Sequence, residues 1–550
     1  MIGVITKESE KRIAREFFEL FKTPWGFYQD AHPYDVVLST CDTSAKVETK
    51  LLIICSSEET EFDSENGIRI ESEKSGGILQ YDNELIPIHG RVAAFAGTEI
   101  PLLIVKGENE IIGFRLNLEG KKVLRIGFDL FQEIGSLLSS GQPAEHSLYP
   151  TLELHISMLR RWILKSGIPL AEILPVPAGY DFSVCLTHDV DFAGIRRHKF
   201  DHTLFGFIYR AFFVSFIRFA ERRISWKKML KNWGAVLSLP GVYLGLAKDF
   251  WQLFDRYHEI EKGLGSTFFI IPSKKNPGAD PSGAIHKKRA ARYDIKDIAD
   301  EVRGLIDHGC EIGLHGIDAW QDVECGIQEL KEISSITGKG EIGVRMHWLY
   351  LDNDSPEILD AAGFLYDSTN AYNDTIGFRA GTAQVFRPLT ARRLLELPMH
   401  IMDTAMFLPG HMNLSENQAM EQVNKVVAAV KRYGGILIIN WHERSLGPER
   451  FWDDFYMSML VNLKKHNAWF GTGTQIIRWF EKRRSCTFNC ANFTNGQSKI
   501  SISSYGDSEG PDLVMRIHKP LSGISTESSK DRGEHIDITF SGELNRVFAL

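Results

Sequence analysis

The chain has 550 residues, of which 43% are hydrophobic and 24% are charged, and its formal net charge at pH 7 is −8. This composition is typical of soluble globular proteins, and the length predicts about two to four domains. The negative net charge excludes a protein that binds nucleic acid through an overall basic character. Seven scattered cysteines, an odd number, argue against a disulfide framework and favour a reducing compartment.

The N-terminal residues and the hydropathy of the chain bear on its localisation. The first residues include several charged side chains and lack the apolar segment of a signal peptide. No uninterrupted apolar run reaches the length of about 18 residues that a membrane-spanning helix needs. We therefore expect a cytoplasmic chain that does not cross a membrane.

Residues 1–150 alternate short apolar runs with polar turns. Residues 9–22 have the pattern of an amphipathic helix, and three later runs have the character of strands. These predicted strands are 51–55, 101–105 and 123–128. No catalytic constellation accompanies them. We predict a separate α/β domain of unknown role, followed by a helical linker over residues 151–178.

A Thr-His-Asp-Val-Asp motif at residues 187–191 follows directly on an apolar run that begins at Phe182. The run is typical of a short buried strand, so Asp189 and Asp191 are expected at the C-terminal end of that strand. Barrel-type α/β folds carry their chemistry in the loops at this end of their strands. The motif therefore predicts a reactive site with two carboxylates.

Four further apolar runs of β character end in polar residues, or are followed by them, in chain order. The residues that these runs contribute are His315, Arg345, His347, Asp367 and His442. Because successive strands of a barrel bring their carboxyl ends together, we expect these side chains to converge with the two aspartates. Histidine and carboxylate groups gathered in this way are typical of a metal-dependent hydrolase.

Over about residues 180–484 this series resembles the polysaccharide deacetylase family, the NodB-like carbohydrate esterases of family 4. Residues 266–271 look like the family's second barrel strand, and residues 307–315 like its passage of helix, glycine, acidic residue, strand and histidine. The resemblance implies a distorted (β/α) barrel. The roles that it implies are general base for Asp189, metal ligand for Asp191 and His315, orientation of the base for Arg345, support of this arginine for Asp367, and general acid for His442.

The chain departs from the family at one expected metal ligand, because Ala319 stands where the family has a second histidine. We favour His347 as the replacement. Residues i and i+2 of a strand face the same way, so His347 is expected on the same side as Arg345. Asp318 is a nearby alternative that would give a ligand set richer in oxygen. The expected cofactor is a divalent metal ion, with Zn²⁺ first.

Three further residues are candidates for substrate binding. The resemblance implies that the backbone N–H of Trp348 binds the oxyanion of the reaction. Residues 377–410 are expected as an insertion in the barrel, and within it Arg379 and Asp403 could contact substrate. The alternative for the last two is an ordinary structural salt bridge.

Residues 196–250 are expected as a first insertion, directly after the aspartate motif. Residues 196–231 hold ten Lys or Arg against two acids, and residues 200–219 hold eight aromatics. A basic helix with an aromatic face can lie on an anionic membrane surface. The alternative is a lid helix whose aromatics pack on the barrel. The first interpretation predicts peripheral contact of residues 196–231 with the inner membrane.

These observations predict a NodB-like barrel over residues 179–484 and a small antiparallel β module over residues 485–550. The expected function is removal of an acetyl group, most simply N-linked, from a sugar in bacterial surface-polysaccharide, exopolysaccharide or glycan-precursor metabolism. The substrate would be an N-acetylated sugar, an oligosaccharide or a lipid-linked glycan. Two alternatives remain: a glycoside hydrolase on a similar barrel, and a glycan-binding barrel that has lost catalysis.

Overall fold

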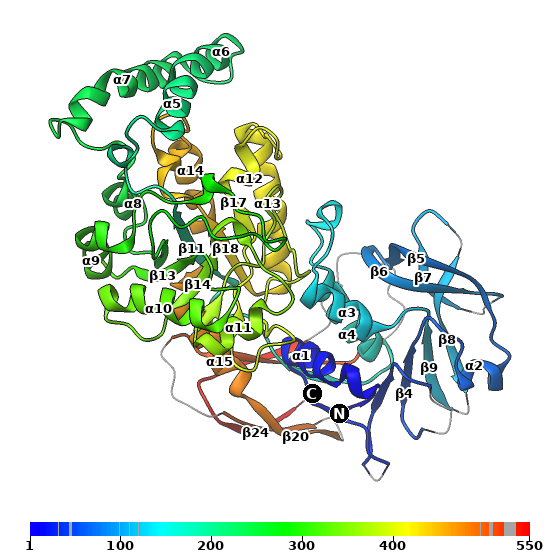
Figure 1. The fold of residues 1–550 in the computed structure, drawn as a ribbon. Helices are drawn as coiled ribbons and strands as arrows, with labels where there is room; N and C mark the ends of the chain where they lie inside the picture. Colours follow the sequence, from blue (N-terminus) through cyan, green and yellow to red (C-terminus); the bar gives the residue numbers. More distant parts are fainter. Residues whose placement is uncertain are drawn as a thin grey trace.

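A computed structural model describes residues 1–30, 32–42, 47–97, 100–108, 110–118, 120–494, 497–504, 510–521 and 535–549. The described residues form two nine-stranded sheets and two three-stranded sheets (Figure 1). One large sheet lies in the N-terminal part, and the other forms the centre of the predicted barrel. The fold is therefore α/β, as the sequence predicts.

The N-terminal sheet is mixed, with strand order β2-β1-β3-β4-β9-β8-β6-β5-β7. The strands from β2 to β9 in this order pair in parallel, and the remaining pairs are antiparallel. The predicted helix is α1, and the three predicted strands are β4, β7 and β9. The bounds of the strands are β1 Ile2–Ile5, β2 Trp25–Phe27, β3 Val36–Ser39, β4 Leu51–Cys55, β5 Ile70–Tyr81, β6 Glu84–Phe95, β7 Pro101–Val105, β8 Ile111–Leu118 and β9 Lys121–Ile126; those of the helices are α1 Lys11–Phe21, α2 Glu61–Asn66 and α3 Leu130–Ser139.

The segment expected as a linker is packed into the N-terminal part. Helix α4 (Thr151–Lys165) places Leu152, Trp162 and Ile163 in the same hydrophobic core as α1 and α3. Strand β10 (Leu170–Ile173) then pairs with β22 (Leu513–His518) near the C-terminus. Residues 151–178 thus serve as a structural junction between the two ends of the chain.

The second large sheet is an incomplete parallel barrel with strand order β16-β15-β14-β13-β12-β11-β18-β17, and β19 pairs with β11. No pairing of described residues joins β16 to β17, so the barrel is open there. Both strands lie within residues 377–410, which are therefore not a simple insertion. The strand bounds are β11 Phe182–Val190, β12 Ser266–Ile270, β13 Glu311–Gly316, β14 Gly343–Met346, β15 Tyr366–Asp367, β16 Leu395–Glu396, β17 Ile401–Met402, β18 Ile436–Asn440 and β19 Ala468–Phe470.

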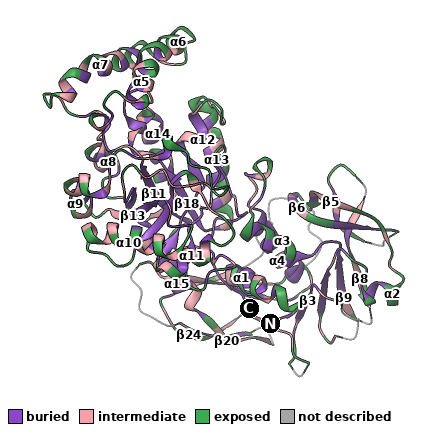
Figure 2. Cartoon of the chain, in the orientation of Figure 1, coloured by how far each residue is buried: buried purple, intermediate pink, exposed green. Residues whose placement is uncertain are grey.

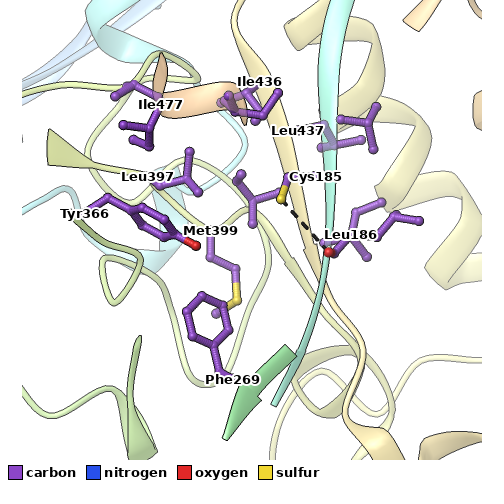
Figure 3. Packing of buried hydrophobic residues seen from close by; sticks show 14 of the residues in the cluster. Cys185, Leu186, Phe269, Tyr366, Leu397, Met399, Ile436, Leu437 and Ile477 are labelled. Carbon is purple, nitrogen blue, oxygen red and sulfur yellow. Dashed lines mark hydrogen bonds between the residues drawn. The ribbon is translucent and has the colours of Figure 1, made fainter. Parts of the chain in front are cut away.

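The barrel strands are buried on both faces, as is usual for parallel strands covered by helices. All five residues of β18 are buried, and all nine of β11. Figure 3 shows how Phe269, Tyr366 and Ile436 pack within this core, and Figure 2 shows the buried centre. The surrounding helices are α8 Phe254–Ile260, α9 Ala299–Asp307, α10 Val323–Thr337, α11 Ser355–Ala362, α12 Asp403–Phe407, α13 Glu416–Tyr433, α14 Asp453–Lys464 and α15 Gly473–Ser485.

The predicted β module at the C-terminus is divided between two antiparallel sheets. Strands β20, β21 and β24 form one, while β22 and β23 join β10 in the other. The module is therefore tied to the N-terminal half of the chain. The bounds are β20 Thr487–Thr494, β21 Gln497–Ser503, β23 His535–Phe540 and β24 Leu544–Ala549.

The first insertion projects from the barrel as helices α5 (His202–Tyr209), α6 (Ser215–Ala220) and α7 (Trp226–Tyr243), with a π-helix at Arg210–Val214 (Figure 1). A small core of its own holds Phe207 and Trp251. Most of its other aromatics are exposed, so the lid interpretation, in which they pack on the barrel, is wrong. The exposed apolar residues include Phe200, Phe205, Tyr209, Phe212, Phe213, Phe216, Ile217, Phe219, Trp226, Leu230, Leu237, Leu244 and Leu246.

One helical segment of the described chain, His202–Ala220, is long and apolar enough to cross a membrane by length and composition. The expectation rested on uninterrupted apolar runs, and Arg210 interrupts this one, so the absence of a spanning helix stays a prediction. Only 28% of the segment is buried, and it carries Arg210 and Arg218. A charged side chain at the centre of a bilayer is costly, so Arg210, which lies near the middle of this segment, disfavours a spanning position.

A buried arginine joins the N-terminal half to the barrel. Arg483 of α15 is 1% exposed and donates hydrogen bonds to backbone carbonyls of Glu19, Leu20, Ile173 and Leu174. A buried carbonyl that loses its donor costs about 1–3 kcal/mol. This side chain therefore stabilises the junction between α1, β10 and α15.

We expect Arg483→Met to lower the free energy of unfolding by about 2–4 kcal/mol, because several buried carbonyls lose their donor. Arg478→Met on the same helix is the matched control, since Arg478 makes only surface ion pairs and should cost no more than about 1 kcal/mol. Urea denaturation followed by circular dichroism measures both. Equal effects of the two variants would contradict the role of Arg483.

Candidate metal-hydrolase site

The strand register brings the predicted site residues to one edge of the barrel. Thr187 of β11 lies opposite Asn440 of β18, and His315 of β13 lies opposite Arg345 of β14. Asp191 and His442 each lie just beyond the end of their strand. The carboxyl ends of β11, β13, β14 and β18 therefore meet, as the sequence predicts.

Asp191, His315 and His347 form the candidate metal site. One ligand atom from each lies within 4.8 Å of the others. The Nε2 atoms of both histidines are 3.3 Å from Oδ1 of Asp191. Two imidazoles and a carboxylate are a common ligand set of catalytic zinc, which leaves a further position open for water or substrate.

The hydrogen bonds of this group fit a bound cation. Nδ1 of His315 lies 3.0 Å from the carbonyl oxygen of Arg345, so this nitrogen is the donor and Nε2 keeps a lone pair toward Asp191. Oδ1 of Asp191 is buried and has no hydrogen-bond partner among the described residues. Burial lowers the pKa of His347 to about 4, so its ring is neutral, as a metal ligand must be.

The alternative ligand Asp318 is engaged elsewhere. Its carboxylate accepts hydrogen bonds from the amides of Asn276 and Gln321. Ala319, at the position of the family's second histidine, is fully buried and offers no ligand atom. His347 is thus the third residue that the structure brings to Asp191 and His315, although it lies at the start of a short 3-10 helix rather than in β14.

Asp189 lies beside the candidate metal site as a buried, ionised carboxylate. Its Oδ1 accepts a hydrogen bond of 2.9 Å from Arg345, and its Oδ2 accepts one of 2.8 Å from Asn440. Burial alone would raise the pKa of Asp189. The charges of Arg345 and of nearby histidines outweigh that effect and hold the pKa below its usual value. The side chain is therefore a proton acceptor fixed in direction.

Arg345 is held by the loop after β15, but through a different residue from the one expected. It donates to the backbone oxygen and the hydroxyl of Ser368 and to the hydroxyl of Thr187. Within the described residues, no hydrogen bond or ion pair joins Arg345 to Asp367. Asp367 instead accepts from the backbone N–H and hydroxyl of Thr369, and burial raises its pKa to about 6.

His442 is paired with Asp403. Nδ1 of His442 lies 2.6 Å from Oδ1 of Asp403, and the backbone N–H of His442 donates to Oδ2. Nε2 of the same ring is 3.9 Å from Oδ2 of Asp191. Burial lowers the pKa of His442, but the carboxylate of Asp403 outweighs burial and raises the pKa above its usual value. The ring is suited to carry a proton at the site.

Asp403 therefore pairs with His442, and its predicted contact with substrate stays a prediction. Its side chain is fully buried, and both oxygens accept hydrogen bonds from His442. Arg379 is also placed differently. Its guanidinium lies 5.6 Å from the ring of Tyr372, and its carbonyl accepts from the backbone of Gln142. No described contact joins Arg379 to the metal group.

Trp348 follows directly on the candidate ligand His347. It is 40% exposed and has a positive φ of 64°. A non-glycine residue in this conformation is uncommon and is often found at functional sites. Its ring lies 5.9 Å from that of His347 and 6.0 Å from that of Tyr350. These contacts put the exposed indole at the rim of the site, where the predicted substrate role remains a prediction.

Sequence reasoning missed three supporting residues: Asn440, Ser368 and Thr187. Two of them could have been found. Thr187 lies two residues before Asp189 on the same face of β11, and Asn440 ends the strand that precedes His442. Ser368 gave no signal, because its partner Arg345 is 23 residues away and the contact depends on strand pairing.

Comparisons with known proteins agree with the motifs. The chain is 24% identical over 210 residues to the peptidoglycan deacetylase-like protein FGM2 of Gibberella zeae. The match covers 33% of this chain and spans 60% of that relative. No protein-family model matches. The predicted resemblance to polysaccharide deacetylases is confirmed by this match.

Three solved structures are similar to the chain at low sequence identity. A Mycobacterium smegmatis structure named as a candidate polysaccharide deacetylase is 18% identical to this chain, with a TM-score of 0.34. The alignment includes 56% of this chain and 93% of that structure. A probable polysaccharide deacetylase from Pseudomonas aeruginosa PAO1 is 15% identical, with a TM-score of 0.32, and the alignment includes 54% of this chain and 89% of that structure. A mutant of a pseudoenzyme of carbohydrate esterase family 4 is 12% identical, with a TM-score of 0.28, and the alignment includes 55% of this chain and 71% of that structure. With TM-scores below 0.5, these structures add nothing to the geometry described above.

We expect the purified chain to bind about one divalent metal ion, and His315→Ala and His347→Ala each to lose it. Loss of a residue that only supports a metal ligand weakens metal binding by roughly 10–100-fold. Loss of a ligand itself should weaken metal binding by more than this. His411→Ala, an exposed histidine, is the control. Metal content by mass spectrometry and chelator competition measure the effect. Full metal content in both ligand variants would overturn this site.

Proposed function

We propose that the chain is a metal-dependent deacetylase that removes an acetyl group, most simply N-linked, from a sugar. The observation that carries the proposal is the convergence of three candidate metal ligands with a buried carboxylate and a carboxylate-paired histidine. The curated relative, a peptidoglycan deacetylase-like protein, supports the same reaction class. We propose Zn²⁺ as the metal, because two histidines and one carboxylate suit it.

The metal would be held by Asp191, His315 and His347. When bound, a divalent cation lowers the pKa of a coordinated water toward about 7 and polarises an acyl carbonyl. Asp189 would accept the proton from the attacking water, since its carboxylate is held ionised and aimed by Arg345 and Asn440. These two donors keep it from rotating away during the reaction.

His442 would donate a proton to the leaving amine. Its Nδ1 is engaged by Asp403, which leaves Nε2 directed toward Asp191 and the substrate side. The raised pKa of His442 favours the protonated form that an acid needs. Asp189 and His442 therefore have complementary environments, one that stabilises a negative charge and one that stabilises a positive charge.

Release of acetate from N-acetylated oligosaccharides should be detectable and should stop when chelator removes the metal. We expect His442→Ala to lower kcat by about 10²–10⁴-fold, because a positioned general acid contributes that much. The variant should keep its metal, and His411→Ala should keep its activity. A glycoside hydrolase would instead release reducing sugar in the presence of chelator. Metal binding without acetate release from any N-acetyl glycan would favour the glycan-binding alternative.

We further propose that the substrate is a membrane-linked glycan precursor and that the first insertion contacts an anionic membrane surface from the cytoplasmic side. Exposed aromatics and many basic side chains share its helices, and Figure 2 shows that much of these helices is exposed. An amphipathic basic surface of this kind binds anionic lipid through apolar burial and charge. All seven cysteines are free, which agrees with a reducing compartment.

We expect the chain to co-sediment with vesicles that contain phosphatidylglycerol, and less so at high salt. A triple variant with Phe205→Ser, Phe213→Ser and Phe216→Ser should weaken binding at least about tenfold, because each buried phenylalanine contributes about 1.5–3 kcal/mol. Ile285→Ser removes a similarly exposed apolar side chain from another region and is the control. Equal binding of the triple variant and the wild type would contradict membrane contact through this insertion.

A further inference from the structure

A cavity of about 390 Å³ lies between the first insertion and the barrel. The insertion contributes residues of the π-helix, α6 and α7, and the barrel contributes the loops after β17 and β18. Its lining is made up of Arg210, Val214, Ser215, Arg218, Ile224, Lys228, Asn232, Leu408, Pro409, Arg444, Glu449, Arg450, Phe451 and Trp452. The sequence analysis did not predict this cavity.

Positive charge dominates the polar lining of the cavity. Five cationic side chains, Arg210, Arg218, Lys228, Arg444 and Arg450, line the cavity with one acid, Glu449, and Lys228 also pairs with two acids outside the lining. The carboxylate of Glu449 is shared, because it lies 2.8 Å from Nε of one arginine and 3.8 Å from a guanidinium nitrogen of another. Like charges that converge on one space repel one another unless an anion enters it. The cavity therefore favours an anionic ligand.

Two of these arginines have N–H groups without a hydrogen-bond acceptor in the described part of the chain. Arg218 makes no side-chain hydrogen bond or ion pair with the described part of the chain, and Nε of Arg444 is buried without a hydrogen-bond partner. Burial and the neighbouring arginines lower the pKa of Arg444 to about 9, so it is still charged at neutral pH. A buried, cationic donor without a partner is costly unless a ligand satisfies it.

The cavity and the candidate metal site share two loops. Arg444 lies two residues after His442, and its guanidinium stacks 4.2 Å from the ring of Phe192, which directly follows Asp191. One ligand could therefore reach both places, with its anionic group in the cavity and its acetylated sugar at the metal.

We infer that this cavity binds the phosphate group that joins the acetylated sugar to its carrier, an inference that rests on the proposed deacetylase function. A phosphate ester carries one to two negative charges and several acceptor oxygens, which match a group of arginines and a lysine better than a single carboxylate does. The apolar lining residues, among them Val214, Leu408 and Trp452, adjoin these cations. They suit the carbon atoms on either side of a phosphate linkage.

Titration of the full metal-loaded chain with inorganic phosphate, followed by calorimetry, tests the cavity itself. We expect saturable binding that weakens at least tenfold in Arg218→Gln and in Arg450→Gln, which lie in different elements. Lys227→Gln is the matched control, because Lys227 adjoins Lys228 on α7 but does not line the cavity. Absent binding, or equal binding in all four proteins, overturns the inference.

A second measurement tests the link to substrate. The ratio of kcat/KM for acetate release from N-acetylglucosamine 1-phosphate to that from N-acetylglucosamine should exceed ten and should fall toward one in Arg218→Gln. A ratio near one in the wild type overturns the inference and leaves the deacetylase proposal intact. Phosphate binding without acetate release from either sugar or from the N-acetylated oligosaccharides refutes the deacetylase proposal, while the anion site itself stands.

Discussion

The burial of an ionised carboxylate is the constraint on which the site depends. Asp189 is 4% exposed, and removing a charge from water costs several kcal/mol unless partners replace the solvent. Arg345 and Asn440 supply one donor to each oxygen. These partners come from β14 and β18, on opposite sides of β11 in the sheet. The charge is therefore tolerated only while the barrel strands keep their register.

His442 and Asp403 stabilise a positive charge in the same way that Arg345 and Asn440 stabilise the negative charge of Asp189. The ring of His442 is largely shielded from water, so its charged form would be disfavoured, yet the carboxylate of Asp403 offsets this effect and raises the pKa. Asp403 can do so because it starts α12 directly after β17, next to β18 in the sheet. The open barrel thus holds a buried carboxylate and a histidine of raised pKa beside the candidate metal ligands. That separation of charge is what general base and general acid chemistry requires.

The positions of Asp191, His315 and His347 could be predicted because each adjoins an apolar run, and parallel strands bring their carboxyl ends together. The roles of Asp403 and Ser368 could not. Asp403 pairs with a residue 39 positions away, and Ser368 with one 23 positions away, and only the strand order puts them in contact. The burial of α4 was missed for a similar reason. Its Glu153 and His155 are polar residues, yet both are buried, and one oxygen of Glu153, Oε1, accepts hydrogen bonds from Thr382 and from the backbone of Ala383.

The position of the first insertion in the chain places it next to the candidate metal site. It starts directly after Asp191 and returns before β12, so its base is anchored at the mouth of the site. Phe192 and Arg444 then connect a metal-ligand loop to the loop that carries the general acid. A ligand held in the basic cavity would be held against both loops at once. Binding energy from a group remote from the scissile bond can then be used to orient that bond, which raises kcat rather than only affinity. The candidate metal ligands and the general acid are fixed at the ends of barrel strands, so the conformational freedom that remains before reaction is that of the substrate. A phosphate group bound in the cavity would reduce that freedom and so favour the reactive orientation.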